Sequence, residues 1–225
     1  MKRHIPNLLT LSNLFCGCLA LVCVFSENML WAAIFVGLAA VFDLLDGMIA
    51  RLLKVSGALG TQLDSLSDLV SFGVVPASMA FVMVRHLAGT PWWAYSVFVM
   101  ALASAYRLGK FNIDDEQHTY FKGMPTPANA LFWAAFSINW GTTVFVGHPT
   151  LLVALAVIFS FLLVCNMKMF SLKIKDWSFR QQWIIYLFAV FAAGMFLLAG
   201  FSGIALAVIC YPIFSYFYFK RKSRF

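Results

Sequence analysis

Four aspartates lie close together in an otherwise apolar stretch, and they are the residues best suited to do chemistry. Asp43 and Asp46 are three positions apart and Asp64 and Asp68 are four apart, so each pair would share one face of a helix. The segment 55–60, VSGALG, holds two glycines and predicts a break between two helices. Folding the stretch about this break as an antiparallel pair brings Asp43 level with Asp68, and Asp46 level with Asp64.

Four carboxylates at this range would repel one another, because a low dielectric strengthens the repulsion between like charges. Bound cations would relieve that repulsion. Ligands that are all oxygen favour hard ions, so the cluster predicts Mg²⁺ or Mn²⁺, with two ions expected. The predicted metal ligands are Asp43, Asp46, Asp64 and Asp68.

Small residues and one cation share the face of the first acidic pair. Gly47 and Ala50 continue the i, i+3, i+4, i+7 spacing that starts at Asp43, so a ligand could approach the backbone there. Arg51 follows at the end of that face, where it could bind phosphate. Carboxylates, hard cations, an arginine and small residues together predict a diphosphate site, in which metals neutralise charge on a leaving group.

The composition predicts that these residues are carried by membrane helices. The 225 residues are 62% hydrophobic and 11% charged, with a mean hydropathy of +0.86, whereas soluble domains average about 25% charged residues. We therefore expect an all-α polytopic membrane protein with about eight transmembrane helices. The expected spans are 8–26, 29–53, 62–87, 92–111, 126–146, 149–166, 181–199 and 201–219.

The basic residues predict the orientation. With a cytoplasmic N-terminus, 15 of the 16 lysines and arginines fall on the inner side of these spans, and only Arg85 falls outside. Basic residues collect on the cytoplasmic side of membrane proteins. We therefore expect both termini and the active site to face the cytoplasm, in the cytoplasmic (inner) membrane.

Three other interpretations fit the sequence less well. The net charge of +7 could suit nucleic acid, but no soluble basic domain remains to bind it, so nucleic acid is not an expected partner. The aspartates could pair with basic side chains, yet only Arg51 and Lys54 are near in sequence, and unpaired carboxylates in a membrane are costly. A cation transporter would account for the carboxylates but not for Gly47, Ala50 and Arg51.

The spacing of these residues resembles the signature of the CDP-alcohol phosphotransferases at every fixed position. The matching pattern is Asp43-x₂-Asp46-Gly47-x₂-Ala50-Arg51-x₈-Gly60-x₃-Asp64-x₃-Asp68. The resemblance implies the fold of that family and an enzyme that displaces CMP from a CDP-linked lipid or alcohol.

The same resemblance implies roles for single residues. Asp43, Asp46 and Asp64 would be metal ligands, and Asp68 would be both a ligand and the general base. Gly47 and Arg51 would contact the nucleotide, and Ala50 and Gly60 are further candidates for substrate contacts. Some relatives have a hydroxyl residue six positions after the signature arginine. This chain has Gly57 there, and the adjacent Ser56 is expected to substitute.

Four further segments resemble bacterial phosphatidylserine synthases of the membrane type: 5–17, 62–77, 107–112 and 121–128. This likeness implies CDP-diacylglycerol as the donor and L-serine as the acceptor. Glycerol 3-phosphate, an inositol compound or an amino alcohol remain alternative acceptors. Further candidates for substrate contacts are Asn7, Thr10, Arg107 and Lys110.

The chain contains no linker or low-complexity tract, so we expect one membrane domain over residues 1–225. Its catalytic signature occupies 43–68. The helices beyond about residue 180 are expected to be accessory or to form a homodimer.

Overall fold

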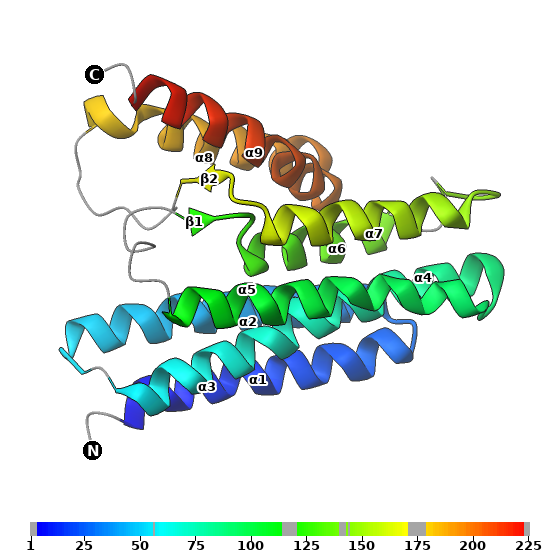
Figure 1. The fold of residues 1–225 in the computed structure, drawn as a ribbon, viewed down its shortest axis with the longest axis horizontal. Helices are drawn as coiled ribbons and strands as arrows, with labels where there is room; N and C mark the ends of the chain where they lie inside the picture. The colour runs from blue at the N-terminus through cyan, green and yellow to red at the C-terminus, as the bar shows by residue number, and fades with distance from the viewer. Residues whose placement is uncertain are drawn as a thin grey trace.

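The computed structural model is built almost entirely of helices that run along one common axis (Figure 1). It describes residues 4–55, 57–113, 121–139, 143, 145–170 and 179–222. The α-helices are α1 (His4–Phe25), α2 (Met29–Leu52), α3 (Ala58–Asp68), α4 (Val75–Ala88), α5 (Val99–Ile113), α6 (Thr126–Asn139), α7 (Pro149–Val164), α8 (Phe179–Ala199) and α9 (Phe201–Lys222). The shorter elements are a π-helical turn η1 (Leu69–Val74), a 3₁₀ helix η2 (Trp92–Phe98), and strands β1 (Phe121–Lys122) and β2 (Lys168–Met169). The two strands form a single antiparallel pair.

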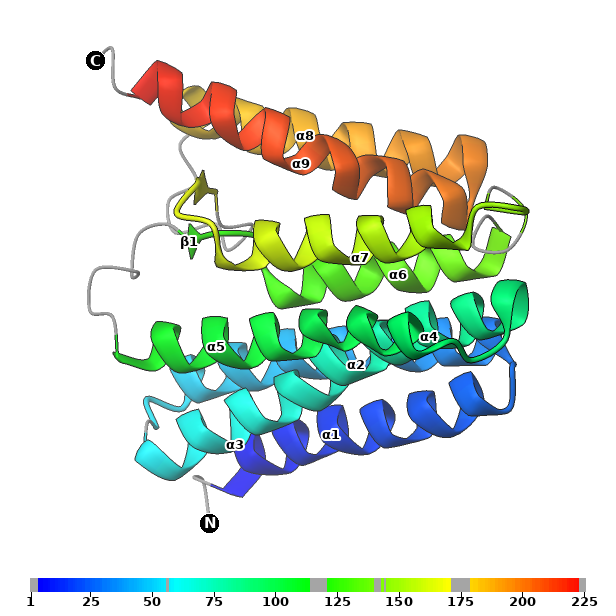
Figure 2. The ribbon, with the colours of Figure 1, turned by 45° about the vertical axis from the view of Figure 1, so that its right-hand side comes forward.

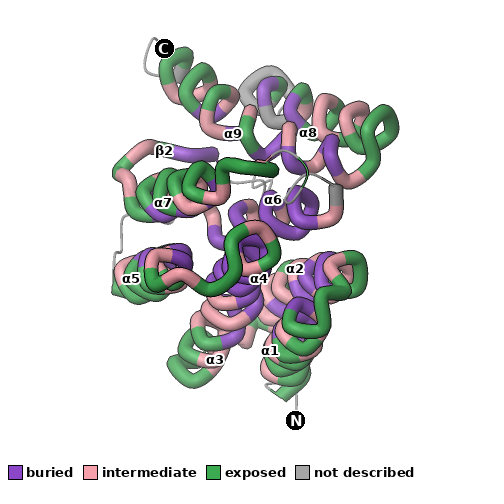
Figure 3. The backbone as a smooth tube through the Cα atoms, turned by 90° about the vertical axis from the view of Figure 1, so that its right-hand side faces the viewer, coloured by how far each residue is buried: buried purple, intermediate pink, exposed green. Residues whose placement is uncertain are grey.

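The helices are stacked in layers. Helices α8 and α9 lie on one side, α6 and α7 come next, and α1 and α3 lie on the opposite side (Figure 2). Helix α4 is central, because every residue from 75 to 84 is buried (Figure 3). Both chain ends lie at the same end of the bundle (Figure 1).

Helices α1 and α2 form a tightly packed pair joined by a very short turn. Asn28 caps α2 by accepting a hydrogen bond from the Trp31 backbone N–H at 3.4 Å, as asparagine often does at this position. Helix α1 also packs against α3, η1 and α4, whereas α2 and α3 hardly touch over their described lengths. The two acidic helices are therefore not the closely packed antiparallel pair that we predicted, since α1 is the helix that contacts both.

The turn between α2 and α3 lies earlier than the predicted break at 55–60. Lys54 takes a left-handed φ of 51°, and Gly57 is extended, with φ −168°, just before the first residue of α3. Gly60 is therefore a helix residue. The reversal uses Lys54 in the conformation that we had expected a glycine to adopt.

Each predicted span overlaps a helical segment, although α6 ends at Asn139, before the end of the predicted span 126–146. Within the described part of the chain, four helical stretches are long and apolar enough to cross a membrane: 4–25, 29–52, 58–88 and 201–221. The third stretch combines α3, η1 and α4, and is longer than the predicted 62–87. The predicted span 92–111 begins as the 3₁₀ helix η2 and continues as α5.

Aromatic side chains fill the interior between the later helices. Phe132 of α6 stacks on Phe159 of α7, with ring centroids 4.2 Å apart. Phe170, which follows β2, contacts the rings of Phe188 on α8 and Tyr211 on α9. The Tyr211 hydroxyl also donates a hydrogen bond to the Phe170 carbonyl oxygen. Helix α9, which pairs with α8, thus packs against β2 and α6.

Helix α1 approaches η1 closely at Gly17. A Cβ atom at this position would overlap Ser71 Oγ and would lie 3.1 Å from Ser71 Cα. Ser71 Oγ in turn donates a hydrogen bond of 3.1 Å to the Asn13 carbonyl. Because Ser71 is buried, it has little room to move. Only glycine fits here without displacing α1 from η1.

We predict that Gly17→Ala lowers the free energy of unfolding by about 1–3 kcal/mol, the usual cost of overpacking a buried contact. The matched control is Gly37→Ala in α2, where an added Cβ meets nothing within 4 Å and alanine favours the helix. Thermal unfolding of both purified variants in the same detergent measures the difference. Equal midpoints for the two variants would contradict the close approach at Gly17.

Candidate active site

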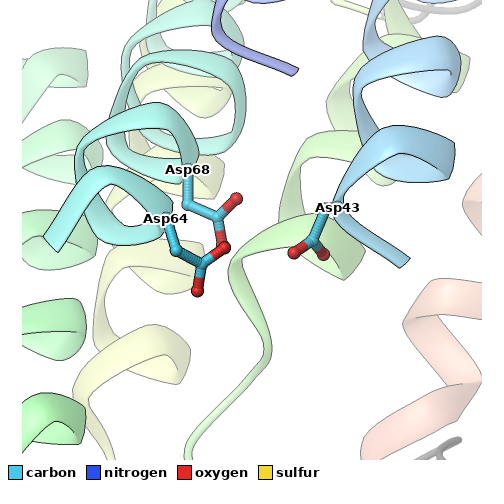
Figure 4. Close-up of side chains that lie close together, drawn as sticks. All are labelled: Asp43, Asp64 and Asp68. Atoms are coloured by element: carbon cyan, nitrogen blue, oxygen red, sulfur yellow. The ribbon is translucent and has the colours of Figure 1, made fainter. Parts of the chain in front are cut away.

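Three of the four predicted aspartates converge on one point. One carboxylate oxygen from each of Asp43, Asp64 and Asp68 lies within 4.8 Å of the other two. Asp43 extends from α2, and Asp64 and Asp68 extend from α3 toward it (Figure 4). Asp68 is buried and the other two are half-buried. The cluster therefore opens to one side, which would admit a ligand.

The donor set of this cluster fits a hard divalent cation. Two oxygens bound to the same Mg²⁺ at about 2.1 Å lie about 3 Å apart when adjacent and about 4.2 Å apart when opposite. The spacing of Asp43, Asp64 and Asp68 needs little contraction to meet that geometry. Carboxylates without sulfur or imidazole partners favour Mg²⁺ or Mn²⁺ over softer ions. The cluster can hold a divalent metal.

Asp46 lies outside this group of three. Its carboxylate is buried and accepts a hydrogen bond of 2.6 Å from Thr10 Oγ1 on α1, although it remains within electrostatic reach of Asp68. We had expected Asp46 to face Asp64. Helix α1 packs against α2 and supplies the hydroxyl that donates to Asp46; the approach of Asp46 to Asp64 stays a prediction. Thr10, predicted as a substrate contact, instead holds an aspartate in the structure.

Asn13 is a site residue that the sequence analysis did not select. Its Nδ2 donates a hydrogen bond of 3.0 Å to Asp68 Oδ1, and it is fully buried on the face of α1 that also carries Pro6, Thr10 and Gly17. A signal was present in the sequence. Asn7, Thr10 and Asn13 recur every three positions, which places three polar side chains along one side of an apolar helix.

The π-helical turn η1 follows Asp68 directly. Pro76 comes next, near the start of α4. Proline has no N–H to donate, and in a regular helix its ring would clash with the carbonyl four residues earlier. The wider turn accommodates Pro76 without ending the helix, and turns of this kind are frequent at functional sites. It also lets one continuous helical stretch carry Asp68 and then the buried Ser71.

The signature residues on α2 border open space. A Cβ on Gly47 would meet nothing within 4 Å, and Ala50 is half-buried beside it. Arg51 is exposed, and its Nε donates a hydrogen bond of 2.9 Å to the Gly47 carbonyl. This stretch of α2 therefore offers small residues and one accessible guanidinium. Ser56, the predicted substitute hydroxyl, lies outside the described residues.

Asn7 and Gly60 come together where α1 meets α3. A Cβ on Gly60 would lie 3.3 Å from Asn7 Oδ1, so the glycine gives this amide room. Asn112, near the end of α5, donates a hydrogen bond of 2.8 Å to Ser65 Oγ on α3. The acidic helix is thus held from α1 on one side and from α5 on another.

The predicted cations of α5 line a separate cleft. Its walls are formed by Tyr106, Arg107, Lys110, Lys122, Leu163, Val164 and Asn166. Arg107 is 8% exposed and lies within electrostatic reach of both Asp68 and Tyr211. The structure therefore brings Arg107 and Lys110 together with Lys122, and Arg107 connects this cleft to the aspartate cluster.

The site therefore has an acidic part and a basic part, which Arg107 connects. The aspartates and a bound cation would hold a diphosphate, because metals bridge carboxylate and phosphate oxygens. The cleft with Arg107, Lys110 and Lys122 would attract an anionic group near the buried Asp68. Asp68 is the carboxylate of the cluster that lies within electrostatic reach of Arg107 in the basic cleft, and a carboxylate can accept a proton from a bound ligand.

Comparison with known proteins agrees with this geometry. Residues 3–164 match the model of the CDP-alcohol phosphatidyltransferase family. The chain is 31% identical over 167 residues to a CDP-diacylglycerol–serine O-phosphatidyltransferase of Bacillus subtilis, which covers 74% of this chain and 89% of the relative.

Two further relatives carry the same name. The Helicobacter pylori protein (strain 26695) is 29% identical over 207 residues, 89% of this chain and 87% of that protein. The Mycobacterium bovis protein is 31% identical over 134 residues, 56% of this chain and 46% of that protein. The family predicted from the aspartate signature is confirmed: the chain belongs to the CDP-alcohol phosphatidyltransferase family.

Proposed function

We propose that this membrane enzyme transfers a phosphatidyl group from CDP-diacylglycerol to L-serine, giving phosphatidylserine and CMP. The observation that carries the proposal is the convergence of Asp43, Asp64 and Asp68 from two helices at the family's signature positions. The acceptor follows from the relatives, each of which is named a CDP-diacylglycerol–serine O-phosphatidyltransferase.

The proposed metal site uses Asp43, Asp46, Asp64 and Asp68, with two Mg²⁺ or Mn²⁺ ions. The close approach of three carboxylates supports the first three ligands of one ion. Asp46 is buried beside them, where Thr10 orients its carboxylate. When bound, the cations neutralise the diphosphate and stabilise the charge that develops on departing CMP.

Asp68 is the proposed general base. The hydrogen bond from Asn13 fixes one carboxylate oxygen of Asp68. Asp68 accepts the proton of the serine hydroxyl as the serine oxygen attacks the β-phosphorus. A new oxygen–phosphorus bond forms, and the bond from that phosphorus to CMP breaks. We expect direct attack, without a phosphatidyl-enzyme, because each carboxylate of the cluster is already assigned to a metal.

The remaining predicted residues are assigned to the substrates. Gly47, Ala50 and Arg51 border open space on α2, which suits the cytidine diphosphate. Asn7 and Gly60 lie next to each other where α1 meets α3, and they are proposed as further substrate contacts. Arg107 and Lys110, with Lys122, are proposed to bind the carboxylate of serine. Three cations would also suit a phosphorylated acceptor, so the charge of the cleft alone does not select serine.

Eight membrane crossings with both termini in the cytoplasm remain the proposed topology. The shared end of the bundle for both termini supports an even number of crossings (Figure 1). Arg85, the one basic residue assigned to the outer side, forms an ion pair of 2.8 Å with Glu27, so its charge is compensated there. A single domain over 1–225, and a homodimer formed through the last two helices, stay predictions.

An acceptor screen tests the proposed reaction. Purified enzyme with CDP-diacylglycerol should release CMP when L-serine is added, with phosphatidylserine as the lipid product. Glycerol 3-phosphate, an inositol phosphate and ethanolamine serve as competing acceptors, with release of CMP and lipid mass as readouts. If glycerol 3-phosphate, the inositol phosphate or ethanolamine supports turnover and L-serine does not, the proposed acceptor is wrong while the family assignment stands.

Metal removal tests the aspartate site. We predict that excess EDTA abolishes transfer and that Mg²⁺ or Mn²⁺ restores it, because the diphosphate is held through the ions. The same cations should raise the thermal unfolding midpoint of the apoprotein, since they bind only the folded cluster. The control is Asp43→Asn, in which the cation-dependent rise should shrink. Full activity after dialysis against EDTA would exclude this metal site.

Substitutions separate the roles of two aspartates. Asp68→Asn should lower kcat by about 10²- to 10⁴-fold, the usual contribution of a general base, while much of the affinity for CDP-diacylglycerol remains. Asp46→Asn should weaken metal binding and donor binding together. Turnover is followed as CMP release, and donor affinity as the shift in unfolding midpoint with added CDP-diacylglycerol. Wild-type kcat in Asp68→Asn would assign the base to another group.

A further inference from the structure

Helices α8 and α9 enclose an apolar groove that the proposed reaction does not use. The groove has a volume of about 340 Å³, at the lower end of the range of about 300–1,000 Å³ typical of ligand sites. Its lining residues are Trp183, Ile184, Leu187, Phe214, Phe217 and Arg221. Phe214 forms its floor, where the ring contacts Phe188 and Phe191 of α8.

The groove changes from apolar to charged along its length. Arg221 is exposed near the end of α9, and its guanidinium carbon lies 5.3 Å from the centre of the Trp183 ring. From Arg221 to Phe214 the groove runs about 10 Å along α9, at about 1.5 Å per residue. One cation and one tryptophan thus mark the mouth, and only apolar side chains line the deeper part.

This polarity matches the place of the groove in a membrane helix pair. The mouth lies at the bundle end that carries both chain termini (Figure 1), and tryptophan is enriched where helices meet the membrane surface. Lys220 and Lys222 flank Arg221 in the last turn of α9, and the sequence 220–224, KRKSR, carries four basic residues. Clusters of four or more basic residues next to a membrane helix attract anionic lipid headgroups.

We propose that the groove binds one anionic phospholipid, with its phosphate on Arg221 and an acyl chain along Leu187, Phe214 and Phe217. A guanidinium binds phosphate oxygens in a fixed, often bidentate geometry. The acyl chain of the lipid would cover the exposed apolar walls of the groove, where Leu187 is 47% exposed and Phe217 57% exposed. The charge at the mouth selects an anionic headgroup over a zwitterionic one.

This lipid site is separate from the aspartate cluster. Helices α8 and α9 lie on the far side of α6 and α7 from α1 and α3 (Figure 2), and they fall outside residues 3–164 that match the family model. The helices of the groove nevertheless contact the rest of the protein. Helix α9 packs on α6, and the Tyr211 hydroxyl donates a hydrogen bond to the Phe170 carbonyl beside β2. A lipid bound in the groove would stabilise the packing of α9 on α6.

Photocrosslinking in lipid nanodiscs tests the proposal. The protein is reconstituted in phosphatidylcholine with a small fraction of phosphatidylglycerol that carries a diazirine in its acyl chain, and labelled peptides are identified by mass spectrometry. Labels should concentrate on the peptides that contain Trp183 to Leu187 and Phe214 to Phe217. Phosphatidylcholine with the same diazirine should label them at least about fivefold less, since each cation near an anionic headgroup contributes about that factor.

Two variants that each remove one charge distinguish specific lipid binding at Arg221 from nonspecific electrostatic attraction of anionic lipid to the basic end of α9. Arg221→Gln should lower the phosphatidylglycerol label by about tenfold, because it removes a charge-assisted contact. Lys220→Gln is the matched control: its ammonium lies over the Tyr216 ring, at 5.6 Å, and is not among the groove residues. Screening by salt should keep its effect below about twofold. Equal losses in the two variants would overturn the site.

One further variant and one competition experiment test whether the label reports lipid bound in the groove. Leu187→Trp should fill the groove and reduce labelling by both lipids, which keeps the test valid if Arg221→Gln unfolds. Excess cytidine diphosphate should leave the phosphatidylglycerol label unchanged, because it competes only at the aspartates. A label that falls with cytidine diphosphate, or equal labelling by the two lipids, would refute the proposal.

Discussion

Repulsion among carboxylates is the constraint around which this protein is organised. Asp43, Asp64 and Asp68 bring oxygens within 4.8 Å of one another, and partial burial strengthens their repulsion. Without a bound cation, such a cluster destabilises the folded protein, so other contacts must hold the helices in place. Helix α1 provides them: Thr10 fixes Asp46 and Asn13 fixes Asp68. The first helix of the chain therefore supports carboxylates that lie well beyond it in the sequence.

The same constraint explains why α1 approaches α3 and η1 so closely. A hydrogen bond from a short side chain such as asparagine requires the two backbones to be near each other, and the glycines at 17 and 60 permit that approach. The π-helical turn after Asp68 then continues the helix into the buried α4. A rigid central helix thus anchors the proposed base. Rigid support of this kind is what positions a proton acceptor to within a fraction of an ångström.

The sequence was informative where chemistry depends on spacing along one helix, and less so where it depends on packing between helices. The aspartate signature predicted the family and the convergence of Asp43 with Asp68. The hydrogen bond from Thr10 to Asp46 could not be foreseen from the two acidic helices alone, because it depends on α1, which packs against both. Asn13 went unrecognised for the same reason. Its side chain becomes significant only once α1 is placed beside α3.

The last two helices show how an element outside the family match can still belong to the working structure. Tyr211 of α9 bonds to the carbonyl beside β2, and β2 pairs with the strand that carries Lys122. Arg107 stands within electrostatic reach of both Tyr211 and Asp68. A displacement of α9 would therefore change the positions of Arg107 and Lys122 in the basic cleft more directly than the positions of the aspartates. Because those cations are the groups proposed to bind the acceptor, α9 is better placed to influence acceptor binding than donor binding.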